Sequence, residues 1–155
     1  MRRCAFNSLK GTLFDRSQIL EKGGVAPKLF GAIPIPELRD RFRAAKIASN
    51  EIYRKQHPGS GSVTEHEQHV IMRDGFTGVV RIYQPRDTPA DGSPLFVMYH
   101  GGGYCLGGLE NEHINCQNLC ETFGFVVVNA SYRLAPEYTF PTGFNDSYDI
   151  LKWVS

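Results

Sequence analysis

Three successive glycines that follow an apolar run are the feature that most restricts how this chain folds. Residues 95–99 have the sequence LFVMY and read as a buried strand, and residues 100–104, HGGGY, follow at once. Glycine has no side chain, so the backbone turns sharply there and leaves its N–H groups uncovered. Such groups stabilise the negative oxygen that develops when an ester or amide carbonyl is attacked. The segment therefore predicts a strand that ends in an oxyanion-binding loop.

The first third of the chain predicts one helix behind a loosely ordered leader. The leader covers residues 1–35, and Pro36 then opens a helix that runs to about Gln56. One face of this helix is apolar at helical spacing, with Leu38, Phe42, Ala45, Ala48 and Ile52. Residues 58–62, PGSGS, end the helix and make a flexible joint.

The residues after this joint alternate between strand and helix. Strands are expected over residues 66–73, 78–84, 95–99 and 125–128, and helices over residues 110–123 and from Pro141 onward. The first two strands join at Asp74-Gly75, which is a turn signal. A short β-branched run between two helices, residues 125–128, indicates a parallel strand buried on both faces. The last helix is expected to present four residues to the core: Phe144, Tyr148, Leu151 and Val154.

The composition fits one ordinary globular domain. The 155 residues are 41% hydrophobic and 21% charged, and the net charge of +1 suggests no nucleic-acid or anionic-membrane partner. No apolar run approaches the ~18 residues of a membrane span. Polar residues between Asn7 and Arg16 interrupt any signal peptide. We therefore expect no transmembrane segment and a cytoplasmic location.

Neither the cysteines nor the histidines indicate a metal site. The four cysteines form no C-x-x-C pair: Cys4, Cys105, Cys116 and Cys120. Cys116 and Cys120 lie one helical turn apart and are expected to pack as small apolar groups. Four histidines share no spacing with Asp, Glu or Cys that would bind a metal: His57, His66, His69 and His113. We expect His113 to face solvent.

A second long motif agrees with the glycine loop. Residues 131–137 read SYRLAPE, and Phe140-Pro141, Asp146 and Trp153-Val154 follow in order. Together with HGGG, this closely resembles the hormone-sensitive-lipase-like branch of the α/β-hydrolases, whose pattern is H-G-G-G, then Y-R-L-A-P-E, F-P, D and W-V. Residues 81–85, RIYQP, look like the end of the family's second strand. Two motifs in order are far more specific than a lone glycine triplet.

The resemblance implies a fold and a division of the chain. It implies an α/β chain that forms the N-terminal half of an α/β-hydrolase fold, with a mostly parallel sheet flanked by helices and an N-terminal helical cap segment. Residues 1–62 would be the leader and cap helix, and residues 63–155 an incomplete core domain. A helix that simply packs on the sheet remains the alternative to a cap. Ser131 departs from the family, which more often has Asp there.

The resemblance also implies a serine carboxylic ester hydrolase, an esterase or lipase that acts on a small-molecule ester. In the family a serine attacks the ester, a histidine acts as base, and Asp or Glu orients it. No metal or organic cofactor is required. The alternatives are a non-catalytic small-molecule-binding or receptor-like member of the fold, and a non-functional truncated product.

One departure outweighs the matches, because no G-x-S-x-G occurs in the 155 residues. By the family's order, the nucleophile, acid and base follow the W-V helix, so the catalytic Ser, Asp and His are absent from this chain. We expect the chain to be a fragment, a truncated gene product or a genuine short product, and to be inactive alone. By the family's strand order, the strand at residues 95–99 would pair with the strand that carries the nucleophile. Without that partner it is expected to self-associate through an unpaired sheet edge.

Site residues follow from the family pattern. Gly102 and Gly103 match the oxyanion-hole donors through their backbone N–H groups, while His100 and Gly101 shape the loop. Tyr104 either lines the acyl pocket or packs. The resemblance favours a structural network for Arg133, Glu137 and Asp146, because a partly buried Arg needs carboxylate partners. Asp146 is not the triad acid, since that residue follows the serine in the family.

Overall fold

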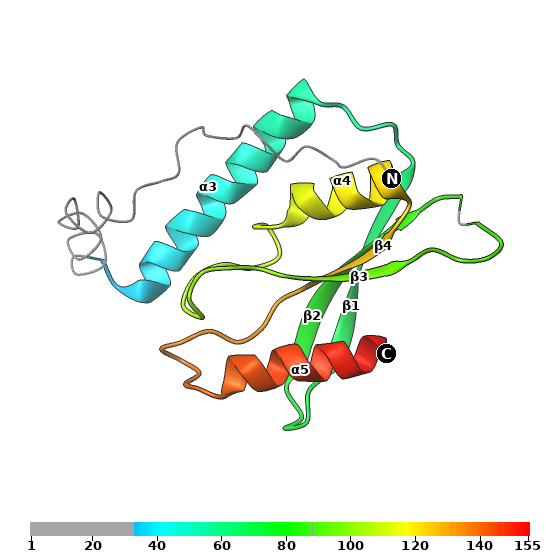
Figure 1. Cartoon of the computed structure of the whole chain (residues 1–155). Coiled ribbons are helices and arrows are strands. Elements are labelled where there is room, and N and C mark those ends of the chain that lie inside the picture. The colour runs from blue at the N-terminus through cyan, green and yellow to red at the C-terminus, as the bar shows by residue number, and fades with distance from the viewer. Residues whose placement is uncertain (1–32, 88) are drawn as a thin grey trace, which may run out of the picture. The chain divides into compact units, whose positions relative to one another are not determined.

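A computed structural model describes residues 33–87 and 89–155 of the chain. Its elements are helix α3 (Ile35–Gln56), strands β1 (Val63–Ile71), β2 (Thr77–Pro85) and β3 (Leu95–Tyr99), helix α4 (His113–Phe123), strand β4 (Val126–Ala130) and helix α5 (Thr142–Val154) (Figure 1). These elements match the predicted ones within a few residues and belong to one compact unit, Ile35–Ser155. The predicted leader falls almost wholly outside the described residues, as does Cys4.

The four strands form one mixed sheet in the order β1-β2-β4-β3. β1 pairs antiparallel with β2, β2 pairs antiparallel with β4, and β3 pairs parallel with β4. The α/β class is confirmed, but a mostly parallel sheet is wrong for these strands. The reason is local: the tight turn at Asp74-Gly75 reverses the chain, and only a crossover through a helix, here α4, makes a parallel pair.

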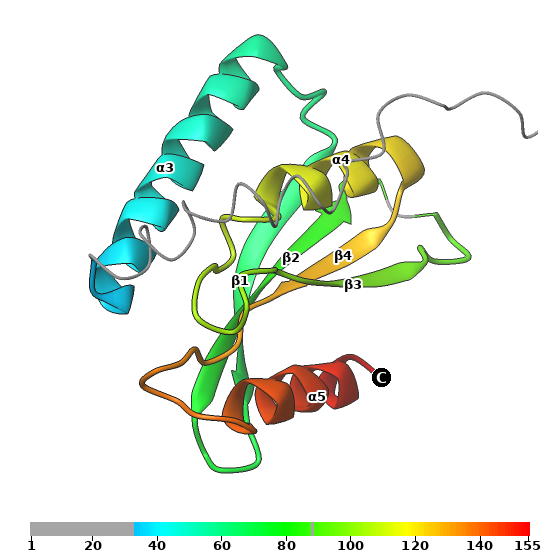
Figure 2. The ribbon, with the colours of Figure 1, turned by 60° about the vertical axis from the view of Figure 1, so that its left-hand side comes forward.

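Helices α4 and α5 cover opposite faces of the sheet (Figure 2). Successive side chains of a strand point to opposite faces, and Val127 and Val128 of β4 show this division. Val127 packs in a cluster with Cys116 and Cys120 of α4, whereas Val128 packs in a second cluster with Ile150 of α5. The predicted burial of the two cysteines is confirmed, and burial raises the pKa of the Cys116 thiol to about 12.

Helix α5 is rotated relative to the prediction. Its buried residues are Gly143, Asp146 and Ile150, and only Val154 of the predicted core face packs against the core. Phe144, Tyr148 and Leu151 are exposed, at 56%, 50% and 47%. Two contacts set the rotation. A Cβ on Gly143 would lie 2.8 Å from the carbonyl oxygen of Arg133, and the Asp146 carboxylate binds the guanidinium of that arginine. A close backbone approach and a buried ion pair therefore outweigh the apolar pattern.

Helix α3 contacts the other described elements mainly through polar side chains. None of its residues is fully buried, and Ile52 of its predicted apolar face is 57% exposed. Instead, Asn50 donates to the carbonyl of Glu110, and Arg54 contacts His113. Its assignment as a cap stays a prediction. Among the described residues, no helix combines the length and apolar character needed to span a bilayer.

Candidate functional site

The glycine loop leaves the C-terminal end of β3 as a tight turn. The carbonyl of Gly102 accepts hydrogen bonds from the N–H groups of Cys105 at 3.1 Å and Leu106 at 3.0 Å. Gly102 has a φ of 128° and Gly103 a φ of 61°. No hydrogen bond within the described part of the chain uses the N–H of Gly102 or Gly103. The two donors that the sequence predicts are therefore free to bind an acceptor.

Gly102 is a glycine for a steric reason. A Cβ at this position would lie 2.1 Å from the carbonyl oxygen of Leu106, and the φ of 128° disfavours any side chain. Gly107 is a second such position, which the sequence analysis missed. Its φ is 104°, and a Cβ there would lie 2.3 Å from Nδ1 of His100. The only available signal was a second glycine pair, Gly107-Gly108, which begins four residues after HGGG ends.

His100 has contacts that hold the loop in place. Its side chain is buried and stacks on Tyr132, with ring centroids 4.3 Å apart, and the Tyr132 hydroxyl donates to the His100 carbonyl at 2.7 Å. Nδ1 lies 2.8 Å from the carbonyl oxygen of Gly101, which only accepts, so Nδ1 carries the proton. Burial lowers the pKa of His100, so the ring is neutral at pH 7. These contacts support the predicted anchoring role of His100.

Tyr104 joins the glycine loop to the SYRLAPE segment. Its carbonyl accepts the N–H of Ala135 at 2.8 Å, and its ring lies 5.3 Å from that of Tyr132. Tyr104 has a φ of 59°, which is uncommon for a residue with a side chain. The ring is half-exposed, at 51%, and lines a cavity of about 500 Å³ next to the glycine loop.

The exposed face of α5 forms one wall of the cavity beside the glycine loop. The cavity lining is largely aromatic and aliphatic, formed by Tyr99, Tyr104, Tyr132, Phe144, Tyr148 and Leu151 around the three glycines. Three of the four α5 residues that were expected in the core therefore line this cavity: Phe144, Tyr148 and Leu151. An apolar wall next to free N–H donors suits an ester, which has an apolar body and one carbonyl to polarise.

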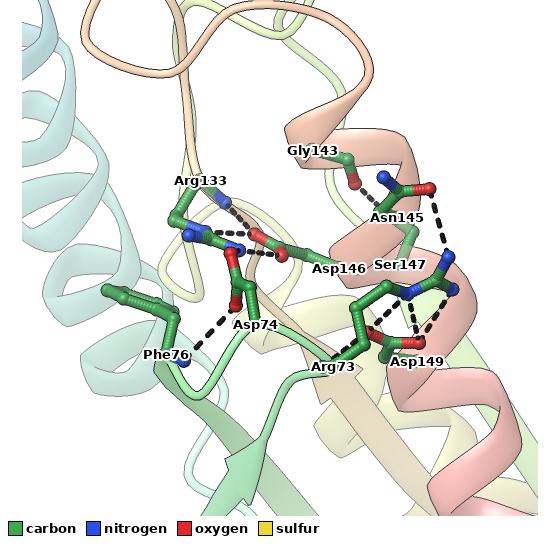
Figure 3. A network of polar contacts seen from close by, with 9 residues as sticks. All are labelled: Arg73, Asp74, Phe76, Arg133, Gly143, Asn145, Asp146, Ser147 and Asp149. Carbon is green, nitrogen blue, oxygen red and sulfur yellow. Dashed lines mark hydrogen bonds and ion pairs between the residues drawn. The ribbon is translucent and has the colours of Figure 1, made fainter.

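Arg133 and Asp146 form a buried ion pair (Figure 3). The guanidinium donates to both carboxylate oxygens, with Nε 2.9 Å from Oδ2 and Nη2 2.6 Å from Oδ1, and the backbone N–H of Arg133 donates to Oδ2 at 3.0 Å. Asp146 is fully buried. Nη2 also lies 2.6 Å from Oδ2 of Asp74 in the β1–β2 turn, and this bond lowers the pKa of Asp74. The pair ties α5 and the hairpin to the SYRLAPE segment.

Glu137 is not in that network, which corrects the prediction. Its carboxylate accepts two hydrogen bonds from Arg39 of α3, at 3.2 and 2.9 Å. These bonds lower the pKa of Glu137. The prediction failed because the partner lies 98 residues earlier in the sequence, on an element whose position the motif does not encode.

The prediction that His113 faces solvent is wrong. Its side chain is 2% exposed, Nδ1 lies 2.7 Å from the hydroxyl oxygen of Tyr83, and Nε2 contacts the guanidinium of Arg54. A guanidinium only donates, so Nε2 accepts and Nδ1 donates to the tyrosine. Burial first, and then the nearby Arg54 and Arg81, lower the pKa of His113 to about 4. His113 is therefore a neutral, buried link between α3, α4 and β2.

Stability should fall in mild acid because of His113. Its pKa is about 4 in the fold and near 6.5 when unfolded, so only the unfolded chain takes up the proton between these values. The expected loss between pH 7.5 and pH 5 is about 2 kcal/mol, measured as the free energy of unfolding in urea. His113→Gln removes the titrating group, so its pH dependence should be flatter by that amount. Equal slopes for the two proteins would contradict the assignment.

Comparison with known proteins agrees with this geometry. A family model described as the alpha/beta hydrolase fold matches residues 96–155. The chain is 41% identical over 86 residues to ethyl acetate hydrolase of Pseudomonas putida, covering 55% of this chain and 27% of that protein. It is 30% identical over 133 residues to lipase 2 of Moraxella sp., covering 78% of this chain and 30% of that protein. The chain thus spans less than a third of the length of these relatives.

Solved structures give the same result. An esterase from Pyrobaculum calidifontis superimposes with a TM-score of 0.66 at 32% identity, covering 82% of this chain and 39% of that one. A thermostable carboxylesterase from a metagenomic library superimposes with a TM-score of 0.67 at 33% identity, covering 79% and 39%. With the glycine loop, the SYRLAPE segment and the order of strands and helices in agreement, the chain belongs to the hormone-sensitive-lipase-like family of α/β-hydrolases.

Proposed function

We propose that this chain supplies the oxyanion-binding part of a serine carboxylesterase that acts on small-molecule esters. The observation that carries the proposal is the pair of free N–H groups on Gly102 and Gly103, at the end of β3 and beside an apolar cavity. The relatives support it, since their names describe an ethyl acetate hydrolase, a lipase and carboxylesterases.

The loop would act on the ester carbonyl. As a serine oxygen attacks the carbonyl carbon, the carbonyl oxygen becomes negative and accepts hydrogen bonds from Gly102 and Gly103. One such donor lowers the barrier by roughly 3–4 kcal/mol when it is held rigidly. Collapse of the tetrahedral intermediate expels the alcohol, and water then releases the acid from the acyl-serine.

The nucleophile, base and acid are proposed to come from outside these 155 residues, which contain no G-x-S-x-G. The purified 155-residue chain should therefore show no hydrolysis of short-chain p-nitrophenyl esters. By the whole gene product we mean the longer protein that would contain this chain together with the nucleophile, base and acid. It should hydrolyse these esters and lose that activity to a serine-directed phosphonate. Phosphonate-sensitive turnover by the chain alone would refute the division of the site. Inactivity of the whole product on all esters would refute the function.

A receptor-like role is the second candidate, because the apolar cavity beside the loop needs no catalytic triad to bind a ligand. The two functions differ in one measurement on the whole gene product. A receptor binds a small apolar ester or acid without consuming it, whereas an esterase releases the alcohol.

The division into a leader and cap helix, residues 1–62, and a core, residues 63–155, is part of the proposal, as is the cytoplasmic location. The isolated chain is also proposed to self-associate. β3 is an edge strand of the described sheet, and Leu95 and Phe96 on it are 50% and 39% exposed. Edge strands of this kind pair with other chains.

Sedimentation velocity tests the edge. The 155-residue chain should sediment as oligomers at micromolar concentration, and Phe96→Lys should shift it toward the monomer, because a charge on an edge strand opposes pairing. Ile52→Lys adds the same charge at another exposed apolar residue, 57% exposed on helix α3, and should leave the oligomers unchanged. A monodisperse wild-type monomer would contradict the proposed self-association through β3.

A further inference from the structure

Arg39 of helix α3 bridges the two loops that build the site. Its Nε donates to the carbonyl of Cys105 at 3.1 Å, and its Nη2 donates to the carbonyl of Ala135 at 2.8 Å. Its two terminal nitrogens also bind the carboxylate of Glu137, at 3.2 and 2.9 Å. One planar cation therefore joins three segments that are far apart in the sequence.

The first of these contacts reaches the turn that carries the oxyanion donors. The N–H of Cys105 donates to the carbonyl of Gly102, so the peptide groups on both sides of Cys105 are held. The second contact is made to Ala135, the residue that links the two loops: its N–H donates to the carbonyl of Tyr104, and its carbonyl accepts from Arg39. Two backbone hydrogen bonds to the Gly102 carbonyl already close this turn, and Arg39 adds a hydrogen bond to it from helix α3.

The chemistry of this clamp requires a guanidinium. Its rigid fork holds two carbonyls and a carboxylate at fixed mutual angles, which the single ammonium of lysine does not. The Arg39 side chain is 23% exposed, so water competes little for its donors, and hydrogen bonds from a charged donor are about twice as strong as neutral ones. Arg41, on the same helix, contrasts with it: it is 64% exposed and pairs with Glu37 one turn away.

We propose that Arg39 is a positioning residue for the oxyanion hole, so that helix α3 helps to hold the oxyanion donors in place. The inference rests on the proposed function, since it concerns donors that act on an ester. Arg39 touches no reacting atom. It keeps the Gly102–Leu106 turn pressed against the SYRLAPE segment, so that the N–H groups of Gly102 and Gly103 keep a fixed direction.

The test uses the whole gene product and its variants Arg39→Ala, Arg39→Lys and, as the matched control, Arg41→Ala. Active sites are counted by titration with a phosphonate, so that misfolded protein does not enter kcat. Arg39→Ala should lower kcat for a short-chain ester about tenfold, less than the loss of a whole donor, with KM changed by less than about threefold. Arg39→Lys should lose nearly as much, and Arg41→Ala should stay within about twofold of wild type.

Inhibition by phenylboronic acid separates positioning from general stability. Addition of the serine oxygen to boron gives a tetrahedral anion that needs the same donors as the transition state, so its Ki should rise by the same factor as kcat falls. A merely structural role would lower the number of active sites and leave Ki unchanged. Unchanged kcat and Ki in Arg39→Ala would overturn the inference, and so would losses of equal size in Arg41→Ala.

A readout without substrate keeps the two proposals distinct. Amide hydrogen exchange in the Gly102–Leu106 turn should be at least about tenfold faster in Arg39→Ala and unchanged in Arg41→Ala. If the wild-type product hydrolyses no ester, the proposed function fails, whereas exchange still decides whether Arg39 holds the loop. If the wild type is active and exchange in this turn does not respond to Arg39→Ala, the positioning role fails alone.

Discussion

Gly102→Ala should lower kcat of the whole gene product about 10²- to 10³-fold, the loss expected when an oxyanion donor is removed. The added Cβ would lie 2.1 Å from the oxygen and 2.6 Å from the carbon of the Leu106 carbonyl, so the turn must open. The φ of 128° adds backbone strain. Steady-state kinetics on a short-chain ester, with titrated active sites, measures the effect.

A glycine just beyond the turn is the matched control. Gly108 has no described atom within 4 Å of an added Cβ and no positive φ, so Gly108→Ala should stay within about threefold of wild type. Gly103→Ala should fall between the two, because its φ of 61° disfavours alanine by about 1–2 kcal/mol but leaves room for the methyl group. If Gly102→Ala were as active as Gly108→Ala, the proposed donor would be wrong.

Asp146→Ala should lower the free energy of unfolding by about 3–5 kcal/mol, the cost of leaving a buried charge without its partner. Asp146 is fully buried, and the Arg133 side chain that it binds is 10% exposed. The remaining partner, Asp74, is 48% exposed and binds one nitrogen. Urea unfolding of the whole product at pH 7 measures the loss.

The same helix carries the control for this experiment. Asp149 accepts hydrogen bonds from the Arg73 guanidinium at distances down to 2.7 Å, but Arg73 is 48% exposed (Figure 3). Water can replace most of the hydrogen bonds in an exposed ion pair, so Asp149→Ala should lower the free energy of unfolding by about 1 kcal/mol or less. Losses of equal size at Asp146 and Asp149 would show that burial does not set the strength of the Arg133–Asp146 pair.

The order of strands and helices, the glycine loop and the family were predictable because their signals are local. The β1–β2 turn follows from Asp74-Gly75, and the end of α4 follows from Gly124, which has a φ of 68° and donates its N–H to Cys120. Gly102 and Gly103 were predictable as candidate donors because HGGG follows an apolar strand. Each of these signals depends on residues a few positions apart.

Two features of the packing were not predictable from these patterns. The apolar residues Phe144, Tyr148 and Leu151 have the spacing of a core face, yet they line the cavity, because Gly143 and Asp146 determine how α5 packs. His113 reads as a surface residue next to polar neighbours but is enclosed between α3, α4 and β2. Patterns report which residues share a face of an element, and not which neighbour meets that face.

The sequence alone was sufficient for the elements, the loop that carries the donors and the family, since backbone propensity and turn chemistry act over a few residues. Only the tertiary structure decided which charges meet. Glu137 was expected near Arg133, but Arg39 binds it from 98 residues away, and the same guanidinium reaches the turn beside Gly102. Which carboxylate an arginine binds depends on where the helices and strands pack, because a hydrogen bond forms only between atoms about 3 Å apart. Two such atoms can be any distance apart in the sequence.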